Sequence, residues 1–307
     1  MVRRLAGLSA HIRPVFMLPV LAVSVCGALL APSVNGWLLA QHAAGAGAAL
    51  FVAHLRDGFV DGHLRGEEDP PLPVSTYRWA TAGATLATLL LVASLAATTT
   101  TLAAGSLIAL LCLALLHAPY LDRYTVPVTV DYPVGIALTL AGGFVTQTGR
   151  LRADIAAVAV SVALLLAAIK VGIDQLDATF DGTIGKRTVP VVVGTTRARW
   201  VAFGGFVATA LAVLAFVWVG VFPWLGIVAA AAAIGCAGAA LTLSPYVAVR
   251  AQIALSYVYV GALFVALCGP DCVAGPFVPL SSIREVHLYL VGGGPQLVKD
   301  FPFTPLL

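Results

Sequence analysis

Residues 153–188 read ADIAAVAVSVALLLAAIKVGIDQLDATFDGTIGKRT, an apolar run that ends in regularly spaced carboxylates. A helix needs about 20 apolar residues to cross a bilayer, and the run over 153–173 has that length. Asp174, Asp177 and Asp181 follow it at helical spacing, which places them on one stripe of a continuing helix. The stretch therefore predicts a membrane span whose end carries a line of carboxylates.

The whole chain shares this apolar character. Of its 307 residues, 60% are apolar and 10% are charged, whereas soluble domains have ~45–50% and ~25%. The mean hydropathy is +0.97. This composition excludes the ordinary soluble classes and predicts a protein that crosses the lipid bilayer several times. The net charge of +3, without a long basic stretch, also argues against nucleic acid as a partner.

Nine segments are long and apolar enough to be spans, and turn-forming residues separate them. They lie at about 14–31, 37–56, 79–97, 102–118, 132–148, 153–173, 200–220, 222–243 and 250–268. We expect an all-α fold in which residues 1–268 form one nine-helix membrane domain. Residues 269–307 are rich in Pro and Gly, and we expect a weakly ordered tail there. The sequence does not determine the oligomeric state.

The distribution of Lys and Arg predicts the orientation in the membrane. With the N-terminus inside, 12 of the 17 Lys and Arg residues fall in inside segments and 4 fall outside. Lys170 lies near the inner end of the sixth span. Inside loops carry an excess of positive charge in membrane proteins. We therefore expect the N-terminus and the acidic loops on the cytoplasmic side, and the C-terminus outside.

A second acidic cluster follows the second span, where Asp57 and Asp61 are four residues apart. Both clusters follow an even number of spans, so they emerge on the same face of the membrane. Carboxylates so close to lipid and to one another need neutralisation. Mg²⁺ prefers oxygen ligands and is commonly bound together with phosphates, so two facing Asp stripes suit a Mg²⁺-bridged diphosphate. We interpret the remaining acids, Glu67, Glu68 and Asp69, as a solvated loop.

Basic and phenolic side chains accompany both clusters. Arg and Lys are suited to binding phosphate oxygens. The candidates for this role are Lys170, Lys186, Arg187, Arg123 and Tyr120. We interpret Arg197, Arg199 and Arg250 as signals of membrane orientation only.

The run from Asp174 to Gly194 closely resembles the second aspartate motif of the UbiA-type intramembrane prenyltransferases, which reads DxxDxxxD followed by GKRTLPV and a Gly. The looser likeness covers about 14–268. It implies nine helices around a central apolar cavity, capped by cytoplasmic-side loops. It also implies that Asp57, Asp61, Asp174, Asp177 and Asp181 bind Mg²⁺ and are catalytic. Tyr120, Arg123 and Arg13, which precedes the first span, fit family positions that contact the diphosphate.

The first motif departs from the family pattern NDxxDxxxD. Asp57 and Asp61 match its second and third aspartates, whereas Ala53 and His54 replace the Asn and the first Asp. Imidazole is not a usual Mg²⁺ ligand. His54 is therefore open to three interpretations: a proton acceptor, a donor to the diphosphate, or a buried structural side chain.

The resemblance implies Mg²⁺-dependent transfer of a prenyl group from a polyprenyl diphosphate to a lipophilic acceptor, such as a quinone precursor, a glycerol ether lipid or a carotenoid. A terpene cyclase of the same fold and an inactive prenyl-lipid-binding homologue are alternatives. A transporter is a weaker one, because transporters place charge near the midplane and these clusters lie at span ends.

Overall fold

The computed structural model describes residues 2–67 and 69–268. Within these residues all regular structure is helical, so the all-α prediction is confirmed. The predicted tail at 269–307 lies outside the described residues, as does Glu68.

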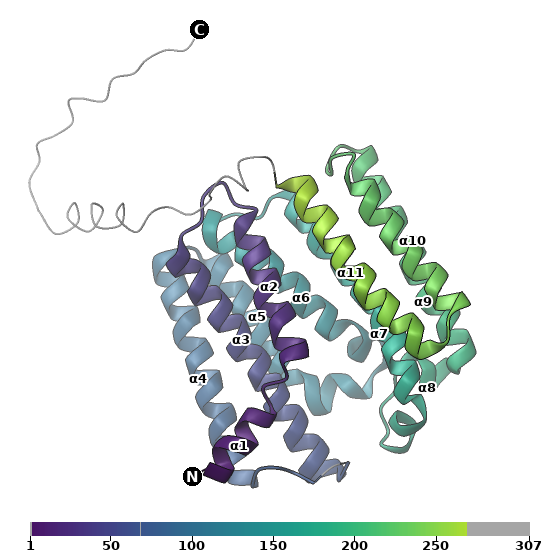
Figure 1. The fold of residues 1–307 in the computed structure, drawn as a ribbon. Coiled ribbons are helices and arrows are strands. Elements are labelled where there is room, and N and C mark those ends of the chain that lie inside the picture. Colours follow the sequence, from purple (N-terminus) through teal and green to yellow (C-terminus); the bar gives the residue numbers. More distant parts are fainter. Residues whose placement is uncertain (1, 68, 269–307) are drawn as a thin grey trace, which may run out of the picture.

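Long apolar helices make up most of the fold (Figure 1). They are α2 (Pro14–Leu29), α3 (Gly36–Phe59), α4 (Val74–Thr98), α5 (Thr101–Tyr120), α6 (Thr125–Thr148), α7 (Ala153–Thr183), α9 (Thr195–Trp218), α10 (Gly226–Thr242) and α11 (Pro245–Leu267). The shorter elements are α1 (Val2–Ala10), the π-helical turn η1 (Val60–Arg65), the 3₁₀ turn η2 (Leu121–Arg123) and α8 (Val189–Val193).

Each predicted span coincides with one long helix. In the described part of the chain, seven helices are long and apolar enough to cross a membrane. The other two, α2 and α10, have only 16 and 17 residues, slightly fewer than the ~20 of a full crossing. The multi-pass membrane architecture is confirmed, whereas nine complete crossings stay a prediction.

The long helices lie side by side in two groups (Figure 1). Helices α2 to α5 lie on one side, α9 to α11 lie on the other, and α6 and α7 pack between them. The last turns of α3 and α7 therefore reach the same end of the bundle as α1, which is what brings the two acidic motifs together.

Glycines let α2 and α6 approach at backbone distance. A Cβ on Gly27 would lie 2.0 Å from the carbonyl oxygen of Leu140, and one on Gly143 would lie 2.3 Å from that of Ser24. In lipid, helix association depends on close packing of this kind, because no hydrophobic force drives apolar helices together. Gly27 and Gly143 thus fix the position of the first predicted span, α2, against α6.

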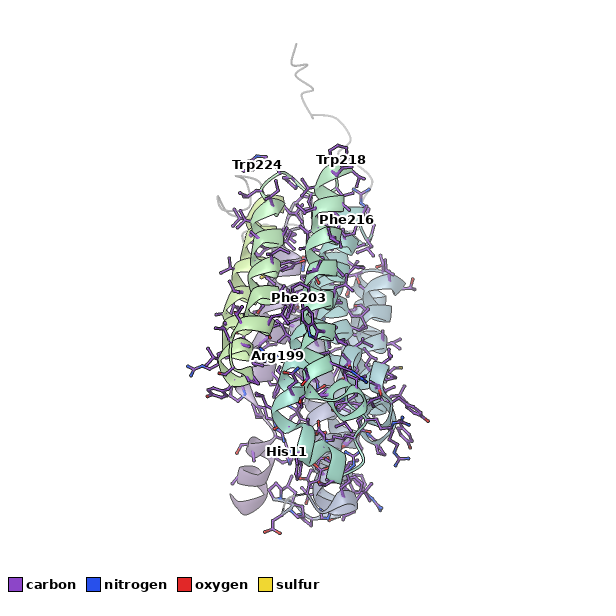
Figure 2. The ribbon with its side chains drawn as sticks, turned by 90° about the vertical axis from the view of Figure 1, so that its right-hand side faces the viewer. His11, Arg199, Phe203, Phe216, Trp218 and Trp224 are labelled. Carbon is purple, nitrogen blue, oxygen red and sulfur yellow. The ribbon has the colours of Figure 1, made fainter. Side chains whose placement is uncertain are left out.

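Exposed tryptophans lie toward the two ends of the bundle. Trp218 and Trp224 are exposed at the end opposite His11 (Figure 2). Trp79 and Trp200 are exposed near the N-terminal ends of α4 and α9, toward the acidic motifs. Trp concentrates at the interface between membrane and water. The apolar zone therefore lies between these two levels, and the acidic motifs sit at one of its edges.

Candidate functional site

The first acidic motif lies where α3 changes into a π-helical turn. Asp57 is in the last turn of α3, and Asp61 and Arg65 belong to η1. Gly66 then adopts a left-handed backbone with φ of 67°, which reverses the chain. The amide of Glu67 consequently donates to the carbonyl of Asp61 at 2.8 Å. This reversal folds the acidic loop back onto the helix that it leaves.

Arg65 is the cation of this motif. Its guanidinium lies 3.2 Å from Asp61 and 3.6 Å from Glu67, and it is also hydrogen-bonded to Asp122 in η2. The Glu67 and Asp122 side chains are 7% and 3% exposed, respectively. The expectation of a solvated loop is therefore wrong for Glu67, because burial at this edge requires its charge to be paired. Asp69, further along the loop, is exposed as expected.

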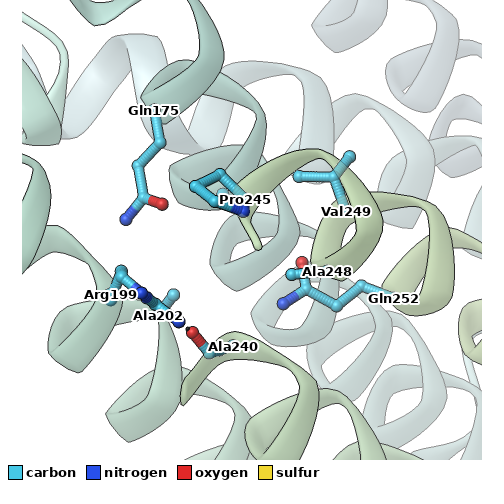
Figure 3. Close-up of a pocket in the computed structure, with 9 residues that line it drawn as sticks. Gln175, Arg199, Ala202, Ala240, Pro245, Ala248, Val249 and Gln252 are labelled. Carbon is cyan, nitrogen blue, oxygen red and sulfur yellow. Dashed lines mark hydrogen bonds between the residues drawn. The ribbon is translucent and has the colours of Figure 1, made fainter. Parts of the chain in front are cut away.

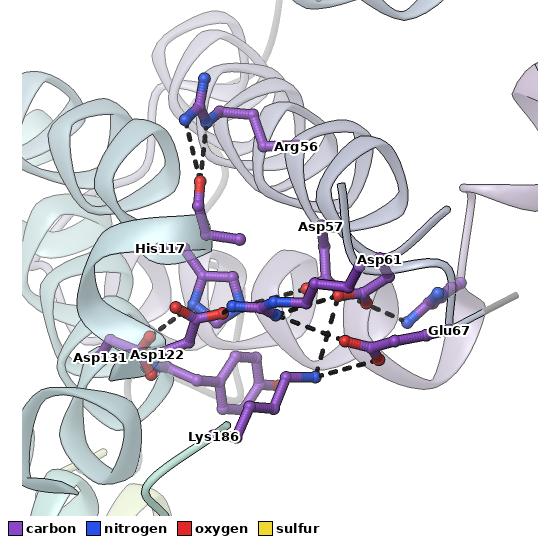
Figure 4. Close-up of polar contacts among 12 residues, drawn as sticks. Arg56, Asp57, Asp61, Glu67, His117, Asp122, Asp131 and Lys186 are labelled. Atoms are coloured by element: carbon purple, nitrogen blue, oxygen red, sulfur yellow. Dashed lines mark hydrogen bonds and ion pairs between the residues drawn. The ribbon is translucent and has the colours of Figure 1, made fainter. Parts of the chain in front are cut away.

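Asp57 contacts two other segments of the chain. Arg13, between α1 and α2, lies 3.7 Å from it, and the Nε2 atom of His117 lies 3.8 Å away. The other ring nitrogen of His117 is hydrogen-bonded to Asp131 of α6 (Figure 4). Asp57, on α3, is thus held by side chains from α5 and from the loop between α1 and α2.

The second acidic motif occupies the last turns of α7, which at 31 residues is the longest helix described. A helix of that length spans ~46 Å, more than the apolar core of a bilayer, so its end reaches the interface. Lys170 is paired with Asp174 one turn away. The hydroxyl of Thr188 donates to Asp181 at 3.3 Å. One oxygen of Asp174, Oδ2, is buried without a hydrogen-bond partner.

Lys186 joins the two motifs. Gly185 has a left-handed backbone with φ of 78°, which turns the chain after α7. The ammonium of Lys186 then lies 3.9 Å from Asp61 and 3.6 Å from Glu67 (Figure 4). Burial lowers the pKa of Lys186, but the nearby carboxylates, chiefly Asp61 and Glu67, hold it above its usual value. Lys186 is therefore a protonated link between residues more than 100 positions apart in the sequence.

Other predicted residues stand apart from these ion pairs. Asp177, Arg187, Tyr120 and Arg123 are exposed, and within the described residues they form no ion pair or side-chain hydrogen bond. They lie beside the motifs in the sequence, since Asp177 is on α7 and Arg123 is in η2. Their roles stay predictions.

His54 is 7% exposed, which agrees with the third interpretation, a buried side chain. Its Nδ1 atom lies 3.0 Å from the carbonyl oxygen of His11. The ring lies one helical turn before Asp57 on α3 and contacts the ring of Phe16 edge-on, at 5.9 Å between centroids.

Several side chains of the network were not singled out from the sequence. These are Arg65, Glu67, His117, Asp122 and Asp131. Arg65 continues the four-residue spacing of Asp57 and Asp61, and this spacing could have identified it from the sequence. His117, Asp122 and Asp131 are isolated polar residues around the fourth and fifth spans, and only the packing of α5 and α6 brings them to the site.

The charge of the site favours an additional cation. The two motifs and their neighbours contain eight carboxylates, and four Lys and Arg side chains contact five of them. Within the described residues, no three acidic, His or Cys side chains are already grouped as metal ligands. The carboxylates are instead held by Arg and Lys, while the unpartnered oxygens of Asp174 and Asp122 are free to bind a hard cation.

A small pocket lies in the other group of helices (Figure 3). Its lining residues include Gln175 of α7, Arg199 of α9 and Gln252 of α11. The described carboxylates of the two motifs are not among its lining residues, so the predicted central apolar cavity stays a prediction. Arg199 donates to the carbonyls of Ala240, Leu241 and Leu243, and thereby caps the end of α10 in addition to its expected topological role.

No protein-family model and no curated protein matches the chain. Solved structures do match it. A digeranylgeranylglyceryl phosphate synthase superposes with a TM-score of 0.67 at 12% identity, over 86% of this chain and 99% of that one. A UbiA homologue from Archaeoglobus fulgidus, bound to GPP and Mg²⁺, gives 0.65 at 13% identity, over 86% and 99%. An apo UbiA homologue from Aeropyrum pernix K1 gives 0.63 at 14%, over 82% and 98%. The chain has the fold of these proteins.

Proposed function

We propose that the protein is a UbiA-type membrane prenyltransferase, which transfers a prenyl group from a polyprenyl diphosphate to a lipophilic acceptor with Mg²⁺ as cofactor. The observation that carries this proposal is the ion pair of Lys186 with Asp61 and Glu67, because it joins the two Asp motifs at one end of the bundle. A similar fold with GPP and Mg²⁺ bound supports the same chemistry.

Each part of the site has a role in this proposal. Asp57, Asp61, Asp174, Asp177 and Asp181 would hold Mg²⁺, and Lys186, Arg187, Arg123, Lys170, Arg13 and Tyr120 would hold the diphosphate. Bound Mg²⁺ would supply positive charge that stabilises the departing diphosphate. The basic side chains stabilise the same charge, and they are positioned before the reaction starts.

The apolar helices would serve the other half of the substrate. The prenyl tail would lie among the spans, while the diphosphate stays at the edge of the membrane. Exclusion of water by the helices would protect the allylic carbon as its bond to oxygen breaks. The acceptor would arrive from the bilayer. Following the Lys and Arg distribution, we place this site on the cytoplasmic side.

The test is Mg²⁺-dependent diphosphate release from geranylgeranyl diphosphate by the protein in lipid, with and without a membrane lipid extract from its host. We expect release that requires both Mg²⁺ and extract, together with a prenylated lipid in the mass spectrum. Asp61→Asn and Asp174→Asn should each lower the rate about 10²-fold or more, because each removes a charged oxygen ligand.

Asp69→Asn is the matched control, since Asp69 is exposed in the same loop and has no part in the proposed site. It should keep the wild-type rate. Release without any acceptor would instead identify a cyclase or hydrolase of the same fold. Binding of the diphosphate without release under any condition would identify an inactive prenyl-lipid binder, and the transferase proposal would fail.

A further inference from the structure

We infer that His54 is the catalytic base of this site, and that its Nε2 atom takes the proton which a hydroxyl-bearing acceptor loses on prenyl transfer. The inference rests on the proposed function and adds to it the group that completes the reaction. It also decides among the three roles that the sequence left open for His54.

The hydrogen bond of His54 fixes the tautomer of its ring. Nδ1 lies 3.0 Å from the backbone carbonyl oxygen of His11. A carbonyl oxygen only accepts, so Nδ1 carries the hydrogen and donates it. In the neutral ring Nε2 then has the lone pair. A neutral His54 is therefore unable to donate to a diphosphate through Nε2, whereas it is ready to accept a proton there.

The accepting nitrogen is also uncommitted. Within the described residues, no hydrogen bond or ion pair involves the Nε2 atom of His54. The neighbouring imidazole differs in this respect. His117 directs one ring nitrogen at Asp131 and the other at Asp57, so both of its nitrogens already face carboxylates.

The depth of His54 matches the expected position of the reacting carbon. His54, Asp57 and Asp61 share one face of the helix that α3 and η1 form, and His54 lies about 4.5 Å further into the membrane than Asp57. The reacting carbon is bonded to an oxygen of the diphosphate, and the tail runs inward from it. With the diphosphate at the Asp motifs, this carbon comes to lie toward the level of His54.

The surroundings of His54 at this level are aromatic. The ring of Phe16 lies 5.9 Å from that of His54 and 5.8 Å from that of Tyr132, edge-on to both. Aromatic faces attract cations, so these rings suit a carbon that develops positive charge. The charged or titratable side chains that act electrostatically on His54 are Arg13, Asp57 and His117, and Arg13 and His117 both also contact Asp57.

In the proposed transfer to a hydroxyl group, one bond to the allylic carbon forms and one breaks. A lone pair on the acceptor hydroxyl oxygen forms a bond to the allylic carbon. The bond from that carbon to the diphosphate oxygen breaks, and its electron pair leaves with the diphosphate. The hydroxyl proton passes to Nε2, which leaves an ether product and a protonated imidazole. His54 returns its proton to water when the products leave.

The experiment compares two amide substitutions in the protein in lipid, with geranylgeranyl diphosphate and host lipid extract as substrates. His54→Asn keeps an N–H group at the position of Nδ1 and removes Nε2. We expect the prenylated product to fall about 10²-fold or more. Binding of geranylgeranyl diphosphate should persist. Diphosphate release, which still requires Mg²⁺ and extract, should fall less than product does, because water admitted beside the smaller Asn side chain takes the place of the acceptor hydroxyl and gives prenyl alcohol. His63→Gln is the control, because the Nε2 atom of His63 contacts the backbone carbonyl of Leu72, and His63 forms no ion pair with the described carboxylates of either motif. It should behave as wild type.

Different results overturn different claims. Wild-type-like product formation by His54→Asn would overturn the base assignment. Equal losses of product and of diphosphate release, with the donor still bound, would also overturn it, because His54 would then act on the donor. No product from the wild-type protein would refute the proposed function itself, and the assignment of His54 with it.

Discussion

At the scale of single residues, charge pairing explains why this site holds together before any ligand arrives. Glu67 and Asp61 are buried acids from one motif, and Lys186 reaches them from the segment after the other. A buried charge is costly unless it is paired. Lys186, which is proposed to bind the diphosphate, therefore also holds together the two segments that carry the motifs.

Lys186→Met tests this pairing. It leaves Asp61 and Glu67 with Arg65 as their remaining cation among the described residues. We therefore expect the free energy of unfolding without Mg²⁺ to fall, but by less than the about 3–5 kcal/mol of a fully unpaired buried charge. Mg²⁺ should stabilise the variant more than the wild type, because it replaces the lost charge. Thermal unfolding in detergent with and without Mg²⁺ measures both effects.

Arg187→Met is the adjacent control. Arg187 is exposed, so its loss should leave stability unchanged. The pH dependence has a definite sign, because the folded-state pKa of Lys186 is raised above the usual 10.5. The contribution of Lys186 is fully present below pH ~10.5 and is lost as the pH rises through the folded value. Equal stability of both variants across this range would contradict the pairing argument.

At the scale of the elements, close backbone contacts set the position of α2. Gly27 and Gly143 allow this helix to lie directly on α6. Arg13 and Phe16, which contact Asp57 and His54, belong to the start of α2 or the loop before it. The geometry of the proposed active site thus depends on glycines several turns away.

Gly143→Ala should separate the two helices. Its Cβ would clash with the carbonyl oxygen of Ser24, so we expect a loss of about 1–3 kcal/mol in stability. Prenyl transfer should fall as well, because Arg13 moves with α2. Unfolding in detergent and product analysis measure the two effects.

Gly135→Ala provides the comparison within the same helix. A Cβ there would meet its nearest neighbour at 3.9 Å, an ordinary contact. That variant should be unchanged or more stable by up to about 1 kcal/mol, since Ala favours a helix over Gly. A similar loss in both variants would show that close α2–α6 packing is not the cause.

At the scale of the whole molecule, the two ends of the bundle differ in charge. The end that contains Asp61 and Lys186 carries the ion network, whereas Trp218 and Trp224 lie at the other end (Figures 2 and 4). The Lys and Arg count predicts that the end with the network faces the cytoplasm.

Single cysteines test this orientation in a chain whose native cysteines are replaced. Gly182 follows the second motif, and Arg150 lies in the turn between α6 and α7, and both are exposed. In intact cells a membrane-impermeant maleimide should label Arg150→Cys and should label Gly182→Cys only after permeabilisation. The reverse pattern would contradict the cytoplasmic placement of the site.

The sequence by itself determined the membrane class, the all-α fold and the places of the long helices. Composition and apolar run length act locally, and lipid leaves the backbone few alternatives to a helix. It also predicted that Asp57, Asp61, Asp174 and Asp181 lie at one end, because the parity of the spans depends only on their order. It was wrong about Glu67, which is buried against the distant Lys186 as well as against its neighbour Arg65.

Only the tertiary structure decided the contacts between segments. The pairing of Arg65 with Asp122, the pairing of His117 with Asp131 and the link from Lys186 to Asp61 depend on how the helices pack. The tautomer of His54 depends on a carbonyl 43 residues away. Such contacts are set by the approach of distant backbones and by which charges become buried together, and neither is encoded in local spacing.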